Sequence, residues 1–176
     1  MAETILIATD GSQHGDRAVE IGAGIAAARG AEVTIVHVLL HRDVSEAERR
    51  MAEIEYADAG SGPSPGAGAG ELPHARFPLA DLLPRAAKDD DAPLRAVGES
   101  ILDRAARQAR DAGVSTVETV LEDGDTVERI LAAAEAAGAG MIVTGARGVS
   151  DLAGVFLGSV SHTLLNRSPV TCVTVR

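Results

Sequence analysis

The strongest constraint on the fold is a regular alternation of short β-prone runs with longer alanine-rich stretches. Five runs are rich in Ile, Val, Leu and Thr, and most are nearly continuous, a pattern typical of strands buried on both faces of a parallel sheet. The alternation predicts one doubly wound α/β domain over residues 1–176, with helices on both faces of the sheet. The predicted strands are Thr4–Thr9, Glu32–Leu39, Thr116–Leu121, Met141–Thr144 and Val170–Val175.

The stretches between these strands have helical periodicity. We predict helices over Ser12–Arg29, Leu94–Ala112 and Thr126–Ala137, and a last helix from Ser159 to about Asn166. In the first of these, spacing of three and four residues predicts an inner face. That face consists of Ala18, Ile21, Ile25 and Ala28. The second helix is predicted to bury Val97, Ile101, Leu102, Ala105 and Ala109, and the third Val127, Ile130, Leu131 and Ala134.

Capping residues support two of the helices. Ser12 is a favourable N-cap residue, and Asp125 followed by Glu128 resembles a capping box. Gly30 and Gly138 stand where a helix C-cap glycine is expected.

One segment, residues 41–93, breaks the alternation. It contains a charged stretch that could form a helix (Val44–Ala57), a Gly/Pro/Ser tract (Gly60–Gly70) and an apolar segment (Phe77–Leu83). The tract is too poor in apolar side chains to pack. We expect a flexible insertion after the second strand; the alternative is a lid over a ligand or a docking segment for a partner.

Charge and composition exclude several classes of protein. The net charge is -10 and the pI is about 4.9, which argues against partners bound through phosphates, such as nucleic acids or a membrane surface. The single cysteine, Cys172, permits no intramolecular disulfide and no cysteine-based metal site. Because the first apolar run, Ile5–Ala8, follows no basic stretch and no run is long enough to span a membrane, we expect a cytoplasmic protein.

A glycine-rich loop, GARGVSDLAGVFLGSVS, follows the fourth strand. Gly145, Gly148 and Gly158 allow a backbone to approach an oxygen-rich ligand closely. Ser159 then begins a helix, whose free N–H groups and positive dipole end favour a phosphate, and Arg147 adds a cation. The loop therefore predicts a phosphate-binding site, although ordinary turn glycines are the simpler alternative.

A second candidate is the sequence ATDGS at the end of the first strand. Asp10 could accept hydrogen bonds from a ribose or a base, and Thr9 is assigned to the same site. If the first and fourth strands are neighbours, a switch point lies between them, where ligands bind beyond the carboxyl ends of the strands. Asp10 and Gly145 would then line one cleft. His14, close to Asp10, is a weaker candidate for ligand contact.

Other motifs have simpler interpretations. GAGIAA (Gly22–Ala27) matches a dinucleotide-binding pattern but lies inside a helix, so we interpret it as helix packing. No Walker-type loop occurs. His37 and His162 are interpreted as packing or surface residues. No catalytic residue and no metal ligand is predicted, and the carboxylates of Glu122, Asp123 and Asp125 are expected to be solvated.

The segments IATDGS, GARGVSDLAGVFLGSVS and SPVTCVTV together resemble the universal stress protein family. The resemblance covers the chain apart from about residues 41–93, which are longer than usual for the family. Its most specific part is the pattern G-x2-G-x9-G-[ST] of the ATP-binding branch, which Gly145, Gly148, Gly158 and Ser159 reproduce.

The resemblance implies the strand order 3-2-1-4-5, with ATP between the first and fourth strands. It also implies that Asp10 contacts the nucleoside and Val38 the adenine. Ribose and phosphates would be held by Gly145, Arg147, Gly148, Gly158, Ser159 and Val160, with Mg²⁺ on the phosphates. A homodimer through the last strand, Val170–Val175, is implied as well.

Three functional hypotheses follow. The first is a regulatory module that holds ATP and whose occupancy or dimer state is read by a partner. The second is a slow ATPase or phosphotransferase that uses Asp10 or His14. The third is a nucleotide-free interaction protein that acts through residues 60–84.

Overall fold

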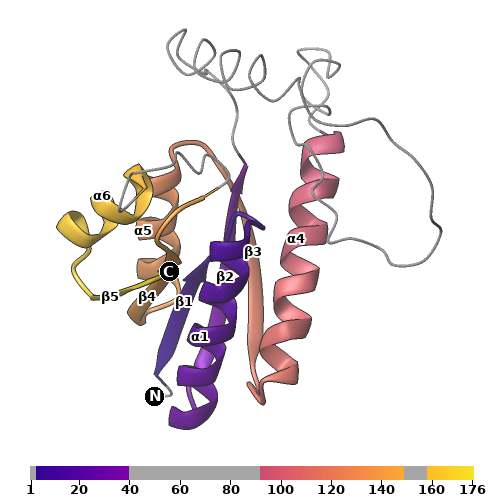
Figure 1. The fold of residues 1–176 in the computed structure, drawn as a ribbon, viewed down its shortest axis with the longest axis vertical. Coiled ribbons are helices and arrows are strands. Elements are labelled where there is room, and N and C mark those ends of the chain that lie inside the picture. Colours follow the sequence, from indigo (N-terminus) through magenta and orange to yellow (C-terminus); the bar gives the residue numbers. More distant parts are fainter. Residues whose placement is uncertain (1–2, 40–91, 149–157) are drawn as a thin grey trace, which may run out of the picture. The chain divides into compact units, whose positions relative to one another are not determined.

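The computed structural model describes residues 3–39, 92–148 and 158–176, which form a parallel sheet with helices against it (Figure 1). The predicted alternation of strands and helices is confirmed. The strands are β1 (Thr4–Ala8), β2 (Glu32–Leu39), β3 (Val117–Asp123), β4 (Ala139–Gly145) and β5 (Thr171–Val175). The helices described in this part of the chain are α1 (Gln13–Arg29), α4 (Ala92–Asp111), α5 (Thr126–Ala136) and α6 (Ser159–Arg167).

The sheet has the order β3-β2-β1-β4-β5, as the resemblance implied. All of its strand pairs are parallel. Strand β1 is central: Ala8 is in register with Val36 of β2 and with Thr144 of β4. Because the chain leaves β1 toward β2 on one side and reaches β4 on the other, the switch point lies between β1 and β4.

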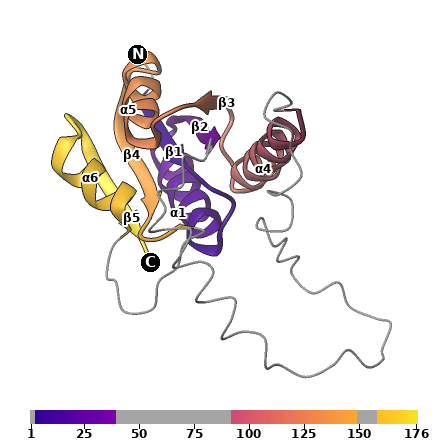
Figure 2. The same ribbon diagram turned by 90° about the horizontal axis from the view of Figure 1, so that it is seen from above.

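Helices cover both faces of the sheet (Figure 2). One core cluster lies beneath α1 and α4 and includes Ile7, Val19 and Leu102. The other lies beneath α5 and α6 and includes Leu6 and Leu164. Alternate side chains of β1 thus enter opposite cores, which explains why this strand is apolar throughout.

The inner face predicted for α1 is wrong in two of its four residues. Ile21 is 36% exposed and Ala28 is exposed, whereas Ala18 is buried as predicted. A β-carbon added at Gly22 would lie 2.7 Å from Ile7 Cδ1, so the helix approaches the sheet on a face of small residues. That face is made of Gly15, Ala18, Val19, Gly22, Ala23 and Ala26. Helix packing is therefore confirmed as the role of Gly22 in GAGIAA.

The inner faces predicted for α4 and α5 agree better with the structure. On α4, Leu102, Ala105 and Ala109 are buried, and on α5 the same holds for Val127 and Ile130. The remaining predicted positions are partly buried, apart from Ala134, which is buried.

The predicted caps are present. The Ser12 hydroxyl accepts the Gly15 N–H at 3.1 Å, and Gly30 ends α1 in the left-handed conformation. The Asp125 carboxylate accepts the Glu128 N–H at 2.9 Å. The C-cap residue of α5 is Ala137, and Gly138, the next residue, has a positive φ of 60°.

The predicted insertion, 41–93, is too long by two residues at its carboxyl end. Helix α4 already begins at Ala92, where a proline in the first turn removes no helical hydrogen bond. The predicted segments Val44–Ala57, Gly60–Gly70 and Phe77–Leu83 lie outside the described residues. None of the described helices is long and apolar enough to cross a membrane.

Candidate functional site

The turn from β1 into α1 is held by its own side chains. Thr9 Oγ1 accepts the Gly11 N–H at 3.2 Å, and Asp10 Oδ1 accepts the Ser12 N–H at 3.0 Å. Gly11 has a φ of +76°, a conformation that favours glycine. The backbone of this turn therefore fixes Asp10 at the carboxyl end of the central strand.

Gly15 lets the first turn of α1 lie directly against this carboxylate. A β-carbon at Gly15 would be 2.7 Å from both Thr9 Oγ1 and Asp10 Oδ1, closer than real contacts of this kind occur. The sequence did not single out Gly15, because a glycine inside a helix carries no indication of what packs against it. It belongs to the site as the residue that makes room for Thr9 and Asp10.

The loop after β4 meets the β1–α1 turn at two glycines. A β-carbon at Gly148 would be 2.5 Å from Asp10 Oδ2, and one at Gly145 would be 2.8 Å from the carbonyl carbon of His14. Asp10 and the glycine-rich loop are thus brought together, as expected if β1 and β4 are neighbours. The atoms of His14 that lie near Gly145 are its backbone carbonyl group and its Cβ.

The amino end of α6 is tied back to the same loop. Gly158 N–H donates to the Ala146 carbonyl at 2.7 Å, and the Ser161 hydroxyl donates to that carbonyl at 3.0 Å. A β-carbon at Gly158 would lie 3.6 Å from Arg147 Cα. Residues 149–157 lie outside the described part of the chain, but their two flanks are in contact.

Helix α6 differs from α1 and α5 at its amino end. Its N-cap residue is Gly158, which has no side chain that could cap the helix, whereas Ser12 and Asp125 cap the other two. The first N–H groups of a helix have no partner within the helix. Ser159, at the start of α6, is exposed, so these donors lie at the surface beside Arg147.

Two of the predicted binding residues have apolar side chains that are buried or partly buried. Val38, at the same end of β2, is 6% exposed and packs in the core beneath α5 and α6. Val160, in the first turn of α6, is partly buried against the same core. The structure thus brings Thr9, Asp10, Gly145, Arg147, Gly148, Gly158 and Ser159 to one edge of the sheet, with Val38 on the adjoining strand.

Sequence reasoning missed several residues that support the β1–α1 turn. His37 Nδ1 is 2.8 Å from the Thr9 carbonyl, and because a carbonyl only accepts, this nitrogen carries the proton. Arg104 of α4 donates to the Gly11 carbonyl at 3.2 Å and pairs with Asp16 at 2.9 Å. These contacts join segments as many as 93 residues apart, and no local spacing reveals them.

The first turn of α1 carries a carboxyl group with an altered pKa. Burial raises the pKa of Asp16 above its usual value; the Arg104 charge opposes this shift, and the Asp10 charge adds to it. Asp16 therefore gains protons more readily than an exposed aspartate, in spite of its ion pair.

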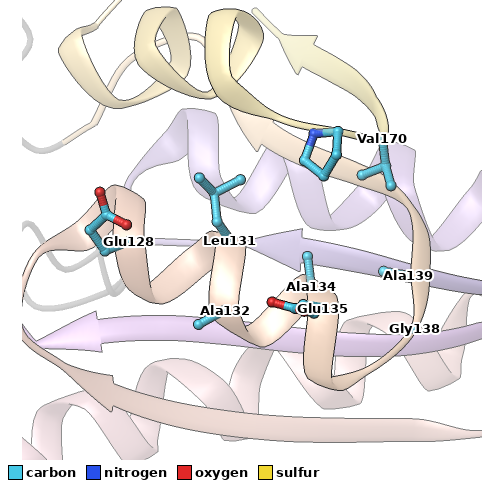
Figure 3. Close-up of a pocket in the computed structure, with 9 residues that line it drawn as sticks. Glu128, Leu131, Ala132, Ala134, Glu135, Gly138, Ala139 and Val170 are labelled. Carbon is cyan, nitrogen blue, oxygen red and sulfur yellow. The ribbon is translucent and has the colours of Figure 1, made fainter.

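A hollow among the described residues lies away from the candidate site, between α5 and the segment leading into β5 (Figure 3). It has a volume of about 520 Å³. Leu131 and Ala134 of α5 line it together with Val170, and none of the predicted binding residues does. Among the residues that the structure describes, no cluster of three or more His, Cys, Asp or Glu side chains could hold a metal ion.

Fold and site together define a doubly wound α/β protein with its candidate cleft between β1 and β4, bordered by a glycine-rich loop and a helix whose N-cap residue is glycine. The sequence matches the model of the universal stress protein family over residues 1–176, and the chain belongs to this family. The resemblance noted from its motifs is thereby confirmed.

Individual relatives agree with this assignment. Universal stress protein YxiE of Bacillus subtilis (strain 168) is 28% identical over 176 residues, which are 100% of both chains. A universal stress protein crystallised in complex with cAMP has a TM-score of 0.59 and 24% identity, covering 99% of this chain and 96% of that one. The universal stress protein of Archaeoglobus fulgidus in complex with dAMP has a TM-score of 0.57 and 17% identity, covering 100% and 98%. At these identities, the two structures establish a shared fold.

Proposed function

We propose that this protein binds ATP between β1 and β4 and acts as a regulatory module whose occupancy is read by a partner protein. The observation that carries the proposal is the approach of Asp10 Oδ2 to Gly148, because it joins a carboxylate and a phosphate-type loop in one cleft. Neither element alone specifies a nucleotide, whereas together they offer acceptors for a ribose and donors for phosphates.

The nucleoside would lie against the β1–α1 turn. Each carboxylate oxygen can accept two hydrogen bonds, so Asp10 can hold the Ser12 N–H and a ribose hydroxyl at once. Thr9 lies beside it, and the adenine would lie against the end of β2 at Val38, whose side chain is 6% exposed. This arrangement accounts for a polar group at the end of an otherwise apolar strand.

The phosphates would lie at the amino end of α6. Its N-cap residue, Gly158, carries no capping side chain and holds the first N–H groups next to Arg147. A helix end of this kind favours an anion through its free donors and its dipole. Gly145 and Gly148 permit close approach of the backbone, and Ser159 and Val160 begin the helix that would receive the phosphates.

The relatives support an adenine nucleotide. One solved universal stress protein contains cAMP and another contains dAMP. We propose ATP as the ligand instead of a monophosphate because Arg147 and the amino end of α6 together offer donors to more than one phosphate. Mg²⁺ would be held mainly by the phosphates, since the described side chains include no metal cluster.

We further propose that the protein holds ATP without rapid turnover. Asp10 Oδ1 is engaged in its own turn, a role that suits holding a nucleoside better than activating a water at the γ-phosphate. Prolonged incubation with ATP and Mg²⁺ should leave most of the ATP intact. Fast hydrolysis that disappears in an Asp10→Ala variant would contradict this view.

The edge of β5 supports a homodimer. In the described part of the chain, β5 pairs with β4 and is the last strand of the sheet. An unpaired strand edge can add a strand from a second copy. Sedimentation equilibrium should give twice the chain mass of 18.0 kDa, and a monomeric mass at micromolar concentration would contradict the dimer.

Calorimetric titration with adenosine, AMP and ATP tests the binding proposal. We expect affinity to rise in that order, because each added phosphate gains donors at α6 and Arg147. An equal affinity for all three ligands would show that α6 and Arg147 do not bind the phosphates. No binding of any of them would contradict the proposed function.

A further inference from the structure

Helix α4 contacts the β1–α1 turn, although it contributes none of the predicted binding residues. Arg104 Nη2 donates to the Gly11 carbonyl at 3.2 Å, directly after Asp10 in the chain. The same nitrogen lies 2.9 Å from Asp16 Oδ1. One side chain of α4 thus joins the turn to the first turn of α1.

Two neighbours on α4 extend this contact. Gln108 Nε2 donates to the Asp16 carbonyl at 3.2 Å. Ile101 packs so closely that its Cδ1 would lie 2.9 Å from a β-carbon at Gly11. Ile101, Arg104 and Gln108 recur at spacings of three and four residues, so they share one face of the helix.

The contact is directed at the part of the turn that determines where Asp10 points. Gly11 has a positive φ, and the Gly11 and Ser12 N–H groups bond to the side chains of Thr9 and Asp10. A surface ion pair by itself contributes little, and half of the Arg104 side chain is exposed. The bond to the Gly11 carbonyl instead fixes the orientation of a peptide next to Asp10.

We propose that Arg104 is a positioning residue for the nucleotide site: it holds the β1–α1 turn in the conformation that presents Asp10 to the nucleoside. The inference rests on the proposed function. It assigns to α4 a specific share in ligand affinity that its sequence pattern, an amphipathic helix packed on a sheet, does not suggest.

The test is a double-mutant cycle on ligand affinity. Arg104→Met keeps most of the length of the side chain and removes its charge and its donors. Arg107→Met is the matched control, because it removes the same charge from an exposed position on α4, and no hydrogen bond or ion pair joins Arg107 to the turn in the described residues. Both changes are made in the wild-type chain and in an Asp10→Asn variant, and each protein is titrated with ATP and with adenosine.

We expect Arg104→Met to lower the affinities for ATP and for adenosine by the same factor, about tenfold. Arg107→Met should change neither affinity by more than about twofold. In the Asp10→Asn background, Arg104→Met should have little further effect, because the group that it positions is already lost. An equal tenfold loss in both backgrounds would overturn the proposal, as would an unchanged affinity of the Arg104→Met variant.

Amide hydrogen exchange without ligand separates this inference from the proposed function. Arg104→Met should speed exchange at the Gly11 and Ser12 N–H groups more than Arg107→Met does. Equal exchange in both variants would show that Arg104 does not hold the turn. If the wild-type chain binds no adenine nucleotide, the proposed function fails on that result alone, and so does the role of Arg104 in affinity.

Discussion

Asp10 Oδ2 and the backbone of Gly148 lie close together beyond the carboxyl ends of the neighbouring strands β1 and β4. A β-carbon at residue 148 would be 2.5 Å from that oxygen, so the close approach requires a glycine. The glycine-rich loop is therefore adapted to a neighbouring carboxylate as well as to any phosphate. This approach brings two separate sequence motifs together in the candidate site.

Gly148→Ala should weaken nucleotide binding and lower the stability of the fold only modestly. Gly148 does not have a left-handed φ, and the atom that must move is the end of a flexible side chain. We expect the free energy of unfolding to fall by only about 1 kcal/mol, because Asp10 gives up its bond to the Ser12 N–H when it moves. The affinity for ATP should fall by about tenfold or more as Asp10 turns away. The matched control is Gly140→Ala, where a β-carbon meets nothing closer than 3.9 Å. Equal affinities in the two variants would exclude this role for the contact.

Two glycines of α1 should respond to alanine in opposite directions. At Gly22 the new methyl group would lie 2.7 Å from Ile7 Cδ1 and 3.4 Å from Val143 Cβ, so we expect a loss of about 1–3 kcal/mol. At Gly24 nothing lies within 4 Å, so alanine should add about 0.5–1 kcal/mol through helix propensity. Urea unfolding of the two variants measures both. A stabilising Gly22→Ala would show that α1 does not pack as closely as described.

The raised pKa of Asp16 has a consequence for stability. Between its ordinary pKa of 3.8 and the raised value, the folded protein binds more protons than the unfolded chain. The contribution of this group to the free energy of unfolding therefore falls as the pH rises through that window, and stays lower above it. Asp16→Asn lacks this titration. We therefore compare the free energy of unfolding of the wild type with that of Asp16→Asn at a series of pH values. The wild-type value minus the variant value should decrease as the pH rises from below 3.8. An increase of this difference would mean that the Arg104 charge outweighs burial.

Arg147→Gln should distinguish phosphate from nucleoside recognition. Arg147 lies next to the amino end of α6, where we place the phosphates. The change should lower the affinity for ATP by about tenfold and the affinity for adenosine by less than about twofold, because only ATP loses a charge-assisted hydrogen bond. Titration at two salt concentrations adds a check, since the difference in ATP affinity between the wild type and the variant should be smaller at high salt. A parallel loss for both ligands would place Arg147 at the nucleoside instead.

The parts of the fold that the sequence predicted are those that short-range chemistry determines. Apolar runs located the strands, and the caps at Ser12, Asp125 and Gly30 marked helix ends because they act within a few residues. The inner face of α1 was mispredicted because large apolar residues were expected to point inward. Gly22 faces the sheet instead, and Ile21 lies at the surface.

In the candidate site, too, the sequence predicted the residues of short motifs and missed those that depend on how helices pack. Asp10 and the glycine-rich loop could be found because each forms a compact motif at the carboxyl end of a strand. The strand order came from the resemblance to a family rather than from the pattern of residues. Arg104 and Gln108 could not be found, because their contacts with the β1–α1 turn depend on how α4 lies against α1, and no local spacing encodes that.

The most direct test of the central claim is the nucleotide content of the purified protein. Heat denaturation followed by chromatography of the supernatant should release ATP from the wild-type chain. A Gly148→Val variant that unfolds as cooperatively as the wild type should release none, because the larger side chain displaces Asp10 and fills the cleft. Absence of nucleotide from the wild type, together with no rise in its melting temperature when ATP and Mg²⁺ are added, would contradict the account.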